Sequence, residues 1–403
     1  MRRLFAHRDA RLYLIGQALS VTGDGALWLA MAIWVKILTH SNSAAGFTIF
    51  AFISGLLTAP LSGLLADRVR RRPLLIWANV GSAALVCLLL IAQHRGDVWL
   101  IYAVLFGYGV LNGLIMVAQT AFLVVLVPDD LLPEANTVLQ TAEQGLRLIT
   151  PLIGAGLLAW VGPDPVILVD VGTVLLAALA LLALRVREQP PERSQEGWNS
   201  ELVAGMRHIG RTPALRRLLI AGVVALVAFG FFQTIPFAVV AQGLHRSPPF
   251  LGVLETATGV GAVVGGLLAT SIIDRTSERA VVLCGVVSCA IAAILLLTTL
   301  LPLVLIGMAL AGACDLWVNI GAYIIIQRNT PVNLLGRVDA ALSMAIVIPQ
   351  AISLAIGASL IAIINYRILL VAVAAILVIA FFIFARGDDE VVVADAYLET
   401  QDS

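Results

Sequence analysis

Twelve long apolar runs occupy most of this 403-residue chain, and they leave few choices of fold. A helix needs roughly 20 apolar residues to cross the hydrocarbon of a bilayer. Hydrophobic residues make up 60% of the chain and charged residues only 12%, which no soluble domain of this size shows. The composition therefore predicts an all-α integral membrane protein with twelve transmembrane helices. The predicted spans are residues 12–38, 44–66, 73–92, 98–127, 137–161, 166–184, 215–241, 250–273, 279–300, 302–327, 338–364 and 368–385.

The Arg and Lys residues predict the orientation of these spans, because cytoplasmic loops are enriched in positive charge. If both termini are cytoplasmic, 20 of the 25 Arg and Lys residues lie on that side and four lie outside. Arg147 is the one that remains, near the middle of a span. The sequence thus predicts a multi-pass protein of the cell inner (plasma) membrane with both termini in the cytoplasm.

A charged segment repeats between the halves of the chain. The sequence GLLADRVRRR at 63–72 is matched by TSIIDRTSER at 270–279, with Asp67 and Asp274 207 residues apart. A second pair, PDDLLPEAN at 128–136 and PVNLLGRVD at 331–339, follows spans four and ten. Such repeats predict two pseudo-symmetric six-helix bundles.

The domain boundaries follow from the one long polar segment, between spans six and seven. Its second part has apolar residues at helical spacing after Trp198, and we expect an amphipathic helix on the cytoplasmic membrane surface. The predicted units are an N-terminal bundle (1–187), a cytoplasmic linker with this helix (188–213), a C-terminal bundle (214–386) and a disordered acidic tail (387–403).

The segment at 63–72 resembles the signature Gly-x-x-x-Asp-Arg-x-Gly-Arg-Arg of the major facilitator superfamily, with Arg70 in place of the inner Gly. Within that superfamily the chain looks most like the macrolide-efflux branch of drug/proton antiporters. Span five carries a degenerate antiporter motif with Pro151 and Gly154. The resemblance implies alternating access with a cytoplasmic gate in each half. The expected gate residues are Gly63, Asp67, Arg68, Arg71, Arg72, Glu134, Asp274, Arg275, Arg279 and Arg337.

Four ionisable residues at membrane depth are candidates for proton coupling, because such residues are costly and usually functional. They are Asp24, Glu143, Arg147 and Asp315. Asp24 could load and release a proton. Glu143 and Arg147 are four residues apart and can pair. Either this pair is structural, or Asp24 or the substrate competes for Arg147 during transport.

Polar, aromatic and Met side chains on the same helices predict the wall of a substrate cavity suited to a fairly large amphipathic molecule. Asn319 and Tyr323 continue the face of Asp315, and Ser20 shares a face with Asp24. The cavity candidates are Ser20, Trp28, Met31, Asn112, Met116, Gln119, Gln140, Phe232, Gln233, Asn319, Tyr323 and Gln350.

These features favour a secondary active transporter that exports hydrophobic or amphipathic small molecules of drug or antibiotic type by proton antiport. The chain has no Walker motif for nucleotide hydrolysis. A lipid or lysolipid flippase, or a siderophore exporter, is the alternative within transport. A receptor-like or scaffold membrane protein is the alternative outside it. We expect no enzymatic activity, metal, cofactor or nucleic-acid partner; the expected partners are membrane lipid, a small-molecule substrate and protons, and a monomer is expected.

Overall fold

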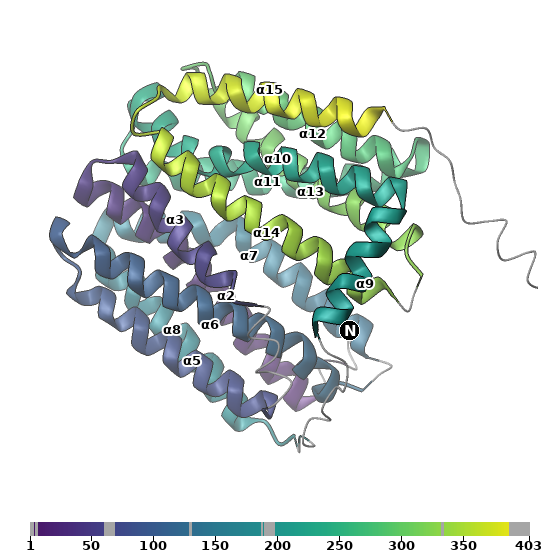
Figure 1. Ribbon diagram of the computed structural model, residues 1–403. Coiled ribbons are helices and arrows are strands. Elements are labelled where there is room, and N and C mark those ends of the chain that lie inside the picture. The colour runs from purple at the N-terminus through teal and green to yellow at the C-terminus, as the bar shows by residue number, and fades with distance from the viewer. Residues whose placement is uncertain are drawn as a thin grey trace, which may run out of the picture.

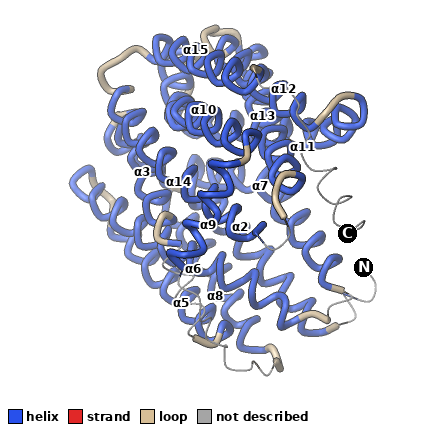
Figure 2. The backbone as a smooth tube through the Cα atoms, turned by 45° about the vertical axis from the view of Figure 1, so that its right-hand side comes forward, coloured by secondary structure: helices blue, strands red, loops and turns tan. Residues whose placement is uncertain are grey.

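A computed structural model shows how the apolar runs pack. The structure describes residues 4, 7–59, 69–128, 131–186, 188, 198–331 and 334–386. Within these ranges the chain is helical, with no strand (Figures 1 and 2). Ten of the described helical stretches are long and apolar enough to cross a membrane, and two shorter apolar helices complete the set of twelve. The predicted all-α, twelve-helix fold is confirmed.

The N-terminal half supplies the first six of these helices. Helix α5 continues into a 3-10 turn, η1, at Leu88–Ile91, and α6 follows the 3-10 turn η2 at Arg95–Asp97. The helices are α2 (Arg8–Thr39), α3 (Asn42–Leu56), α5 (Arg71–Cys87), α6 (Val98–Leu126), α7 (Leu132–Val161) and α8 (Pro163–Ala183).

The C-terminal half repeats this order after one additional helix, α9 (Trp198–Arg211). Helix α9 packs against α14 and α10, with Ile209 buried and Gly205 against the backbone of Arg337. The six membrane helices are α10 (Pro213–Ala238), α11 (Leu251–Arg275), α12 (Glu278–Leu295), α13 (Leu301–Arg328), α14 (Leu335–Leu360) and α15 (Tyr366–Ala385).

Local sequence signals set several of the helix ends. Ser41 and Ser277 cap α3 and α12 by accepting hydrogen bonds, both at 3.2 Å, from the backbone N–H groups three residues ahead. Gly162 joins α7 to α8 with a φ of 97°, a conformation that glycine adopts without steric cost. The two helices can therefore turn back on each other with almost no loop.

The helices pair in the same way in both halves. Helix α2 packs on α7 and α8, and its counterpart α10 packs on α14 and α15. Helix α3 packs on α6, and α11 packs on α13. We call the end of the molecule where α2 begins and α15 ends the terminal face, and the opposite end, which holds the α2–α3 turn, the distal face.

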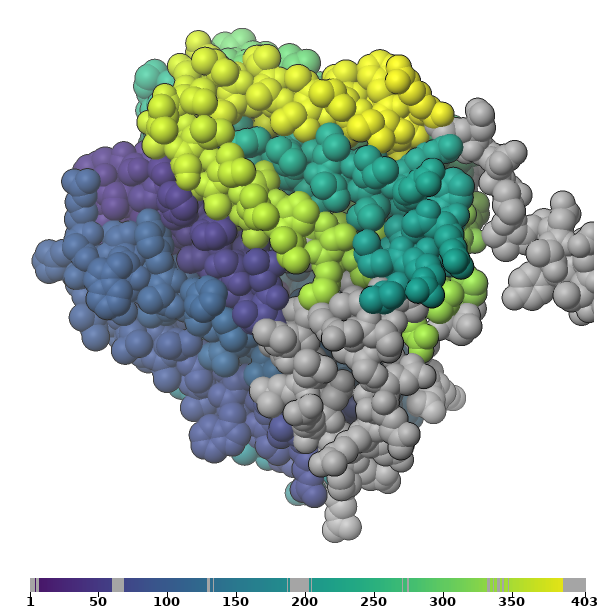
Figure 3. Space-filling view, viewed as in Figure 1, coloured from purple at the N-terminus to yellow at the C-terminus, as the bar shows by residue number. Residues whose placement is uncertain are grey.

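The two bundles touch near the distal face. A Cβ atom on Gly46 of α3 would lie 2.9 Å from Cβ of Ala358 in α14, and one on Gly252 of α11 would lie 2.7 Å from Cβ of Ala155 in α7. All four residues lie in the distal thirds of their helices. Figure 3 shows the halves meeting along α3 and α14. The bundles are therefore closed together at the distal face.

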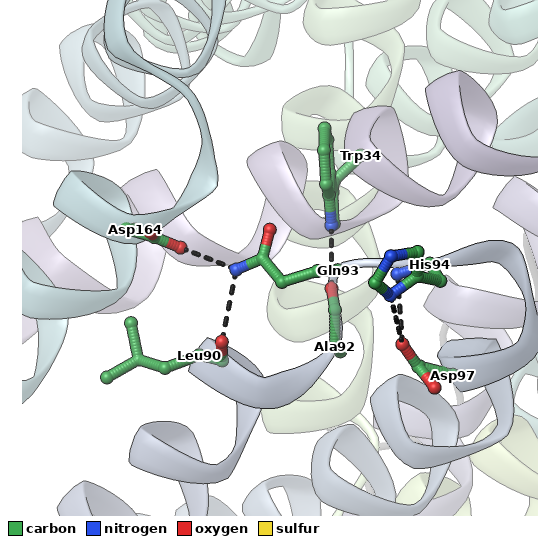
Figure 4. Close-up of polar contacts among 7 residues, drawn as sticks. All are labelled: Trp34, Leu90, Ala92, Gln93, His94, Asp97 and Asp164. Carbon is green, nitrogen blue, oxygen red and sulfur yellow. Dashed lines mark hydrogen bonds and ion pairs between the residues drawn. The ribbon is translucent and has the colours of Figure 1, made fainter.

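The distal loops of the N-terminal bundle are tied to one another by hydrogen bonds (Figure 4). The Gln93 amide donates to Asp164 Oδ1 at the start of α8, at 3.0 Å, and the Trp34 indole of α2 donates to the carbonyl of Ala92 at 3.3 Å. The loop between η1 and η2 is thus hydrogen-bonded to α2 and to the start of α8, and these bonds hold this end of the bundle together.

Candidate functional site

Helix α2 carries an acidic residue between two glycines, and these three residues face different neighbours. A Cβ atom on Gly23 would collide with Asp170 of α8, and one on Gly25 would collide with Thr150 of α7. The glycines let α2 lie close against both helices. Asp24 is thereby fixed between them, toward α6.

Asp24 belongs to a cluster of three ionisable groups inside the N-terminal bundle. The hydroxyl of Tyr108, on α6, donates to Oδ1 of Asp24, and its oxygen lies 3.2 Å from Oδ1 of Asp170. Tyr108 is 3% exposed and Asp170 is 0% exposed, whereas Asp24 is half-buried. Asp24 is therefore the least buried member of the cluster.

Tyr108 and Asp170 are missing from the residues predicted from sequence. Asp170 carried a usable signal, because it is an acidic residue within the apolar run 166–184, as Asp24 is within its own run. Tyr108 carried none, since an aromatic residue in a membrane helix usually packs or faces lipid. Only the packing of α2, α6 and α8 brings the three together.

A second group of charges lies between the bundles. Arg147 of α7 and Asp315 of α13 are both exposed, although both lie within membrane helices. The charge of Arg147 acts on Glu143, one turn away on α7, and on Asp315 of the opposite bundle. Among the described residues no ion pair within 4.0 Å joins Arg147 to either carboxylate. Arg147 thus has charged neighbours in both halves without being locked to either.

Asp315 continues into an exposed polar stripe on α13. Asn319 donates to Oδ1 of Asp315 at 3.1 Å, and Tyr323, one turn further, is 55% exposed. Exposure of three polar residues at helical spacing indicates that this face of α13 lines open space. On α7, Gln140 is also exposed, and it lies one turn from Glu143.

The structure divides the remaining cavity candidates by exposure. Met116 is exposed, and Trp28, Asn112, Gln119, Gln233 and Gln350 are half-buried. Ser20, Met31 and Phe232 are buried in the packed core, at 7%, 1% and 9% exposure.

Part of the predicted gate lies outside the described residues: Gly63, Asp67, Arg68 and the side chain of Asp274. The end of the N-terminal motif is described. Arg72 donates from Nε to the carbonyl of Leu181 and from Nη2 to that of Leu182, both at 2.9 Å. It thereby adds hydrogen bonds to carbonyls in the last turn of α8. Arg71 and Arg72 donate their backbone N–H groups to the carboxylate of Glu188, which caps α5.

The C-terminal half repeats the arginine cap. Arg279, 207 residues after Arg72, donates from Nη2 to the carbonyls of Phe384 and Ala385 at the end of α15, at 3.0 and 2.7 Å. In each half, therefore, an arginine at the start of the third helix caps the end of the sixth. Of the other predicted gate residues, Arg275 is exposed at the end of α11, and Glu134 and Arg337 lie in the first turns of α7 and α14.

The antiporter-like motif lies where α7 contacts two helices. Pro151 is inside α7, and Gly154 lies directly against the backbone of Ala26 in α2. Ala155 lies against Gly252 of α11 in the other bundle. The motif therefore packs α7 both within its own bundle and across the bundle interface.

Two six-helix bundles that enclose charged residues at membrane depth define a polytopic membrane transporter. The sequence model of the Major Facilitator Superfamily matches residues 13–245 and 220–395. The chain belongs to this superfamily.

The comparisons with individual proteins agree with this assignment. The enterobactin exporter EntS of Citrobacter koseri is 23% identical over 344 residues, which cover 83% of this chain and 81% of the relative. EntS of Escherichia coli O127:H6 is 24% identical over 347 residues, with the same coverage. A bacterial homologue of the iron transporter ferroportin, in an inward-facing state, superposes with a TM-score of 0.71 at 14% identity, over 94% of this chain and 98% of that one. The nucleoside transporter NupG superposes with a TM-score of 0.74 at 10% identity, over 93% and 98%.

Proposed function

We propose that the protein is a secondary active exporter that moves an amphipathic small molecule across the inner membrane by alternating access. The observation that carries the proposal is the pair of exposed charges at membrane depth, Arg147 on α7 and Asp315 on α13 of the other bundle, while the distal face is closed. In the orientation predicted from the arginine distribution, the terminal face is cytoplasmic. A transporter closed at its distal face would then take substrate from the cytoplasmic side.

We propose a siderophore as the substrate class, ahead of the drug or antibiotic type favoured by the sequence motifs. Two observations support this order. The relatives that match most of the chain are named as exporters of enterobactin. An exposed Arg147 also offers a cation to an acidic or oxygen-rich ligand, as arginine does in many sites.

We propose protons as the coupling ion and Asp24 as the residue that carries them. Asp24 is an acidic group at membrane depth, and because it is only half-buried we assign it the exchange of the proton with water. Glu143 and Asp315 are the other candidates, and the charge of Arg147 acts on both of them.

The substrate and the energy source can be tested together in inverted membrane vesicles. We expect vesicles that contain the protein to accumulate radiolabelled enterobactin when a proton gradient is applied, and to lose it when a protonophore is added. Arg147→Gln should lower the initial rate at least about tenfold, because a charged contact to a ligand contributes about 1.5–3 kcal/mol.

The matched control is Arg95→Gln, which removes the same charge from an exposed loop at the distal face. It should leave the rate near that of the wild type. Transport of a macrolide but not of enterobactin would return the assignment to the drug type. Accumulation that is insensitive to the protonophore would contradict proton coupling.

A further inference from the structure

The Tyr108 hydroxyl lies close to both Asp24 and Asp170. If both acids are charged, the cluster has only one hydrogen for these two contacts. The Tyr108 hydroxyl has one hydrogen, and it is donated to Asp24. The same hydroxyl oxygen lies 3.2 Å from Oδ1 of Asp170. A second hydrogen bond at that distance requires a hydrogen on Asp170, because a carboxylate can only accept.

The other oxygen of Asp170 points to the same conclusion. Oδ2 of Asp170 is buried and has no hydrogen-bond partner. A charged carboxylate with an unpartnered oxygen costs far more in the interior than the carbonyl of a neutral acid. Asp170 is fully buried, so water does not reduce this cost.

The helices around the cluster offer no described cation in contact with it. Helix α7 presents the Thr150 hydroxyl, which is buried and unpartnered, and its charged residues Glu143 and Arg147 lie one to two turns toward the terminal face. Helix α3 has no ionisable residue between Asn42 and Leu56. The ionisable residues of α5 lie at its two ends, and they are Arg71, Arg72 and Cys87. Nothing described here therefore neutralises two negative charges side by side.

We propose that Asp170 is a protonated carboxylic acid whose O–H donates to Tyr108, which in turn donates to the carboxylate of Asp24, so that the three residues form a binding site for one exchangeable proton. Asp170 and Tyr108 act as positioning residues, and Asp24 exchanges the proton with water. The role of this site in coupling rests on the function proposed above, whereas its protonation state does not.

The proton balance of the site is simple. In the unloaded state Asp170 is neutral, Asp24 is charged, and the cluster carries one negative charge. Loading places one proton from water on Asp24, and the cluster becomes neutral.

Infrared difference spectra between the wild type and each variant, recorded at a series of pH values on protein purified in lipid nanodiscs, test the site without any substrate. We expect an acid carbonyl band that persists from mildly acidic to mildly alkaline pH and is absent from Asp170→Asn. A second acid band should appear on acidification and be absent from Asp24→Asn. Persistence of all acid bands in Asp170→Asn, with loss of a carboxylate band instead, would overturn the proposal.

A second variant keeps the test valid if Asp170→Asn does not fold. Tyr108→Phe retains both acids but removes the hydroxyl, so the pH-insensitive band should shift in frequency as Asp170 loses its acceptor. The matched control is Tyr102→Phe on the same helix, whose hydroxyl donates to the carbonyl of Ala44 at 2.9 Å. Both bands should be unchanged in that control, and an unshifted band in Tyr108→Phe would contradict the proposed contact.

Transport measurements then separate this site from the proposed function. Tyr108→Phe removes a donor to the Asp24 carboxylate, so the pH profile of proton-driven transport should move to an about tenfold lower proton concentration. Asp170→Val should lower transport at least about tenfold, and Asp170→Asn should recover most of that loss, because its amide can donate to Tyr108 as the acid does. If the spectra are as expected but no proton-driven transport is measured, only the proposed function is contradicted. An unchanged profile in Tyr108→Phe would remove the site from coupling.

Discussion

Gly154 shows how one residue can fix the distance between two helices. A Cβ atom at this position would meet the backbone of Ala26, including its Cα at 2.8 Å, and backbone cannot rotate away as a side chain can. Gly156, half a turn further along the same helix, has nothing within 4 Å of its Cβ position. The two glycines of α7 therefore have different structural roles despite their proximity.

We predict that Gly154→Ala lowers stability and that Gly156→Ala does not. Overpacking costs about 1–3 kcal/mol at a site that cannot relax, and alanine in a helix gains about 1 kcal/mol over glycine. Gly154→Ala should thus unfold at a lower temperature than the wild type in detergent, while Gly156→Ala should match or exceed it. Equal melting temperatures for the two variants would show that α2 and α7 separate easily.

At the scale of residues, the sequence shows which positions are unusual but not which of them meet. Asp24 stands out because it is an acid in an apolar run, and Asp170 has the same property. Their common partner, Tyr108, lies on a third helix and depends on the two glycines that bring α2 close to its neighbours. That contact depends on tertiary packing over 146 residues of sequence, from position 24 to position 170, which no local pattern encodes.

At the scale of elements, the two arginine caps come from matching positions of the sequence repeat, because Arg72 and Arg279 end the segments 63–72 and 270–279. Arg72 binds the end of α8 and Arg279 binds the end of α15, each through two main-chain carbonyls. Positive charge at a helix C-terminus is also favoured by the helix dipole. Each cap therefore fixes the third helix of a bundle to the sixth at the terminal face.

We predict that Arg72→Ala and Arg279→Ala each lower the stability of their own bundle. Hydrogen bonds to charged groups contribute about 1.5–3 kcal/mol, and partial exposure at the helix ends reduces this to about 1–2 kcal/mol. Lysine at either position should recover only part of the loss, because it lacks the planar fork that reaches two carbonyls. Thermal unfolding in detergent measures both effects, and full recovery by lysine would mean that charge alone matters.

The elements themselves were largely predictable. A run of about 20 apolar residues must become a helix in lipid, where every backbone polar group needs an internal partner. Even spans nine and ten, separated in sequence only near Leu301, are two helices, with α12 ending at Leu295 and α13 beginning at Leu301. The role of Glu188 as the cap of α5 was not predictable, because it lies in a polar linker far from α5 in sequence.

At the scale of the whole molecule, the structure is built from two bundles whose close contacts run from the distal face to the middle of α7, where Gly259 of α11 lies against Leu148. Gly252 of α11 meets Ala155 of α7 across the interface, and Gly265 of the same helix meets Ala313 of α13 within the C-terminal bundle. A transporter that works by alternating access must open the first contact during transport, while the second moves with its bundle as a rigid body. The two glycine–alanine pairs therefore distinguish motion between bundles from motion within one.

We predict that a disulfide across the first pair blocks transport and that one across the second does not. The relevant Cβ positions lie 2.7 Å apart in Ala155/Gly252 and 2.9 Å apart in Ala313/Gly265, so each pair must separate by about 1 Å to reach disulfide geometry. The double variants A155C/G252C and A313C/G265C would be made in a background in which the native cysteines Cys87, Cys284, Cys289 and Cys314 are replaced by alanine. Oxidation should stop accumulation of enterobactin in vesicles only for the first variant, and a reductant should restore it. If the first variant is fully cross-linked and still transports, the distal contact does not open, and alternating access through this interface is wrong.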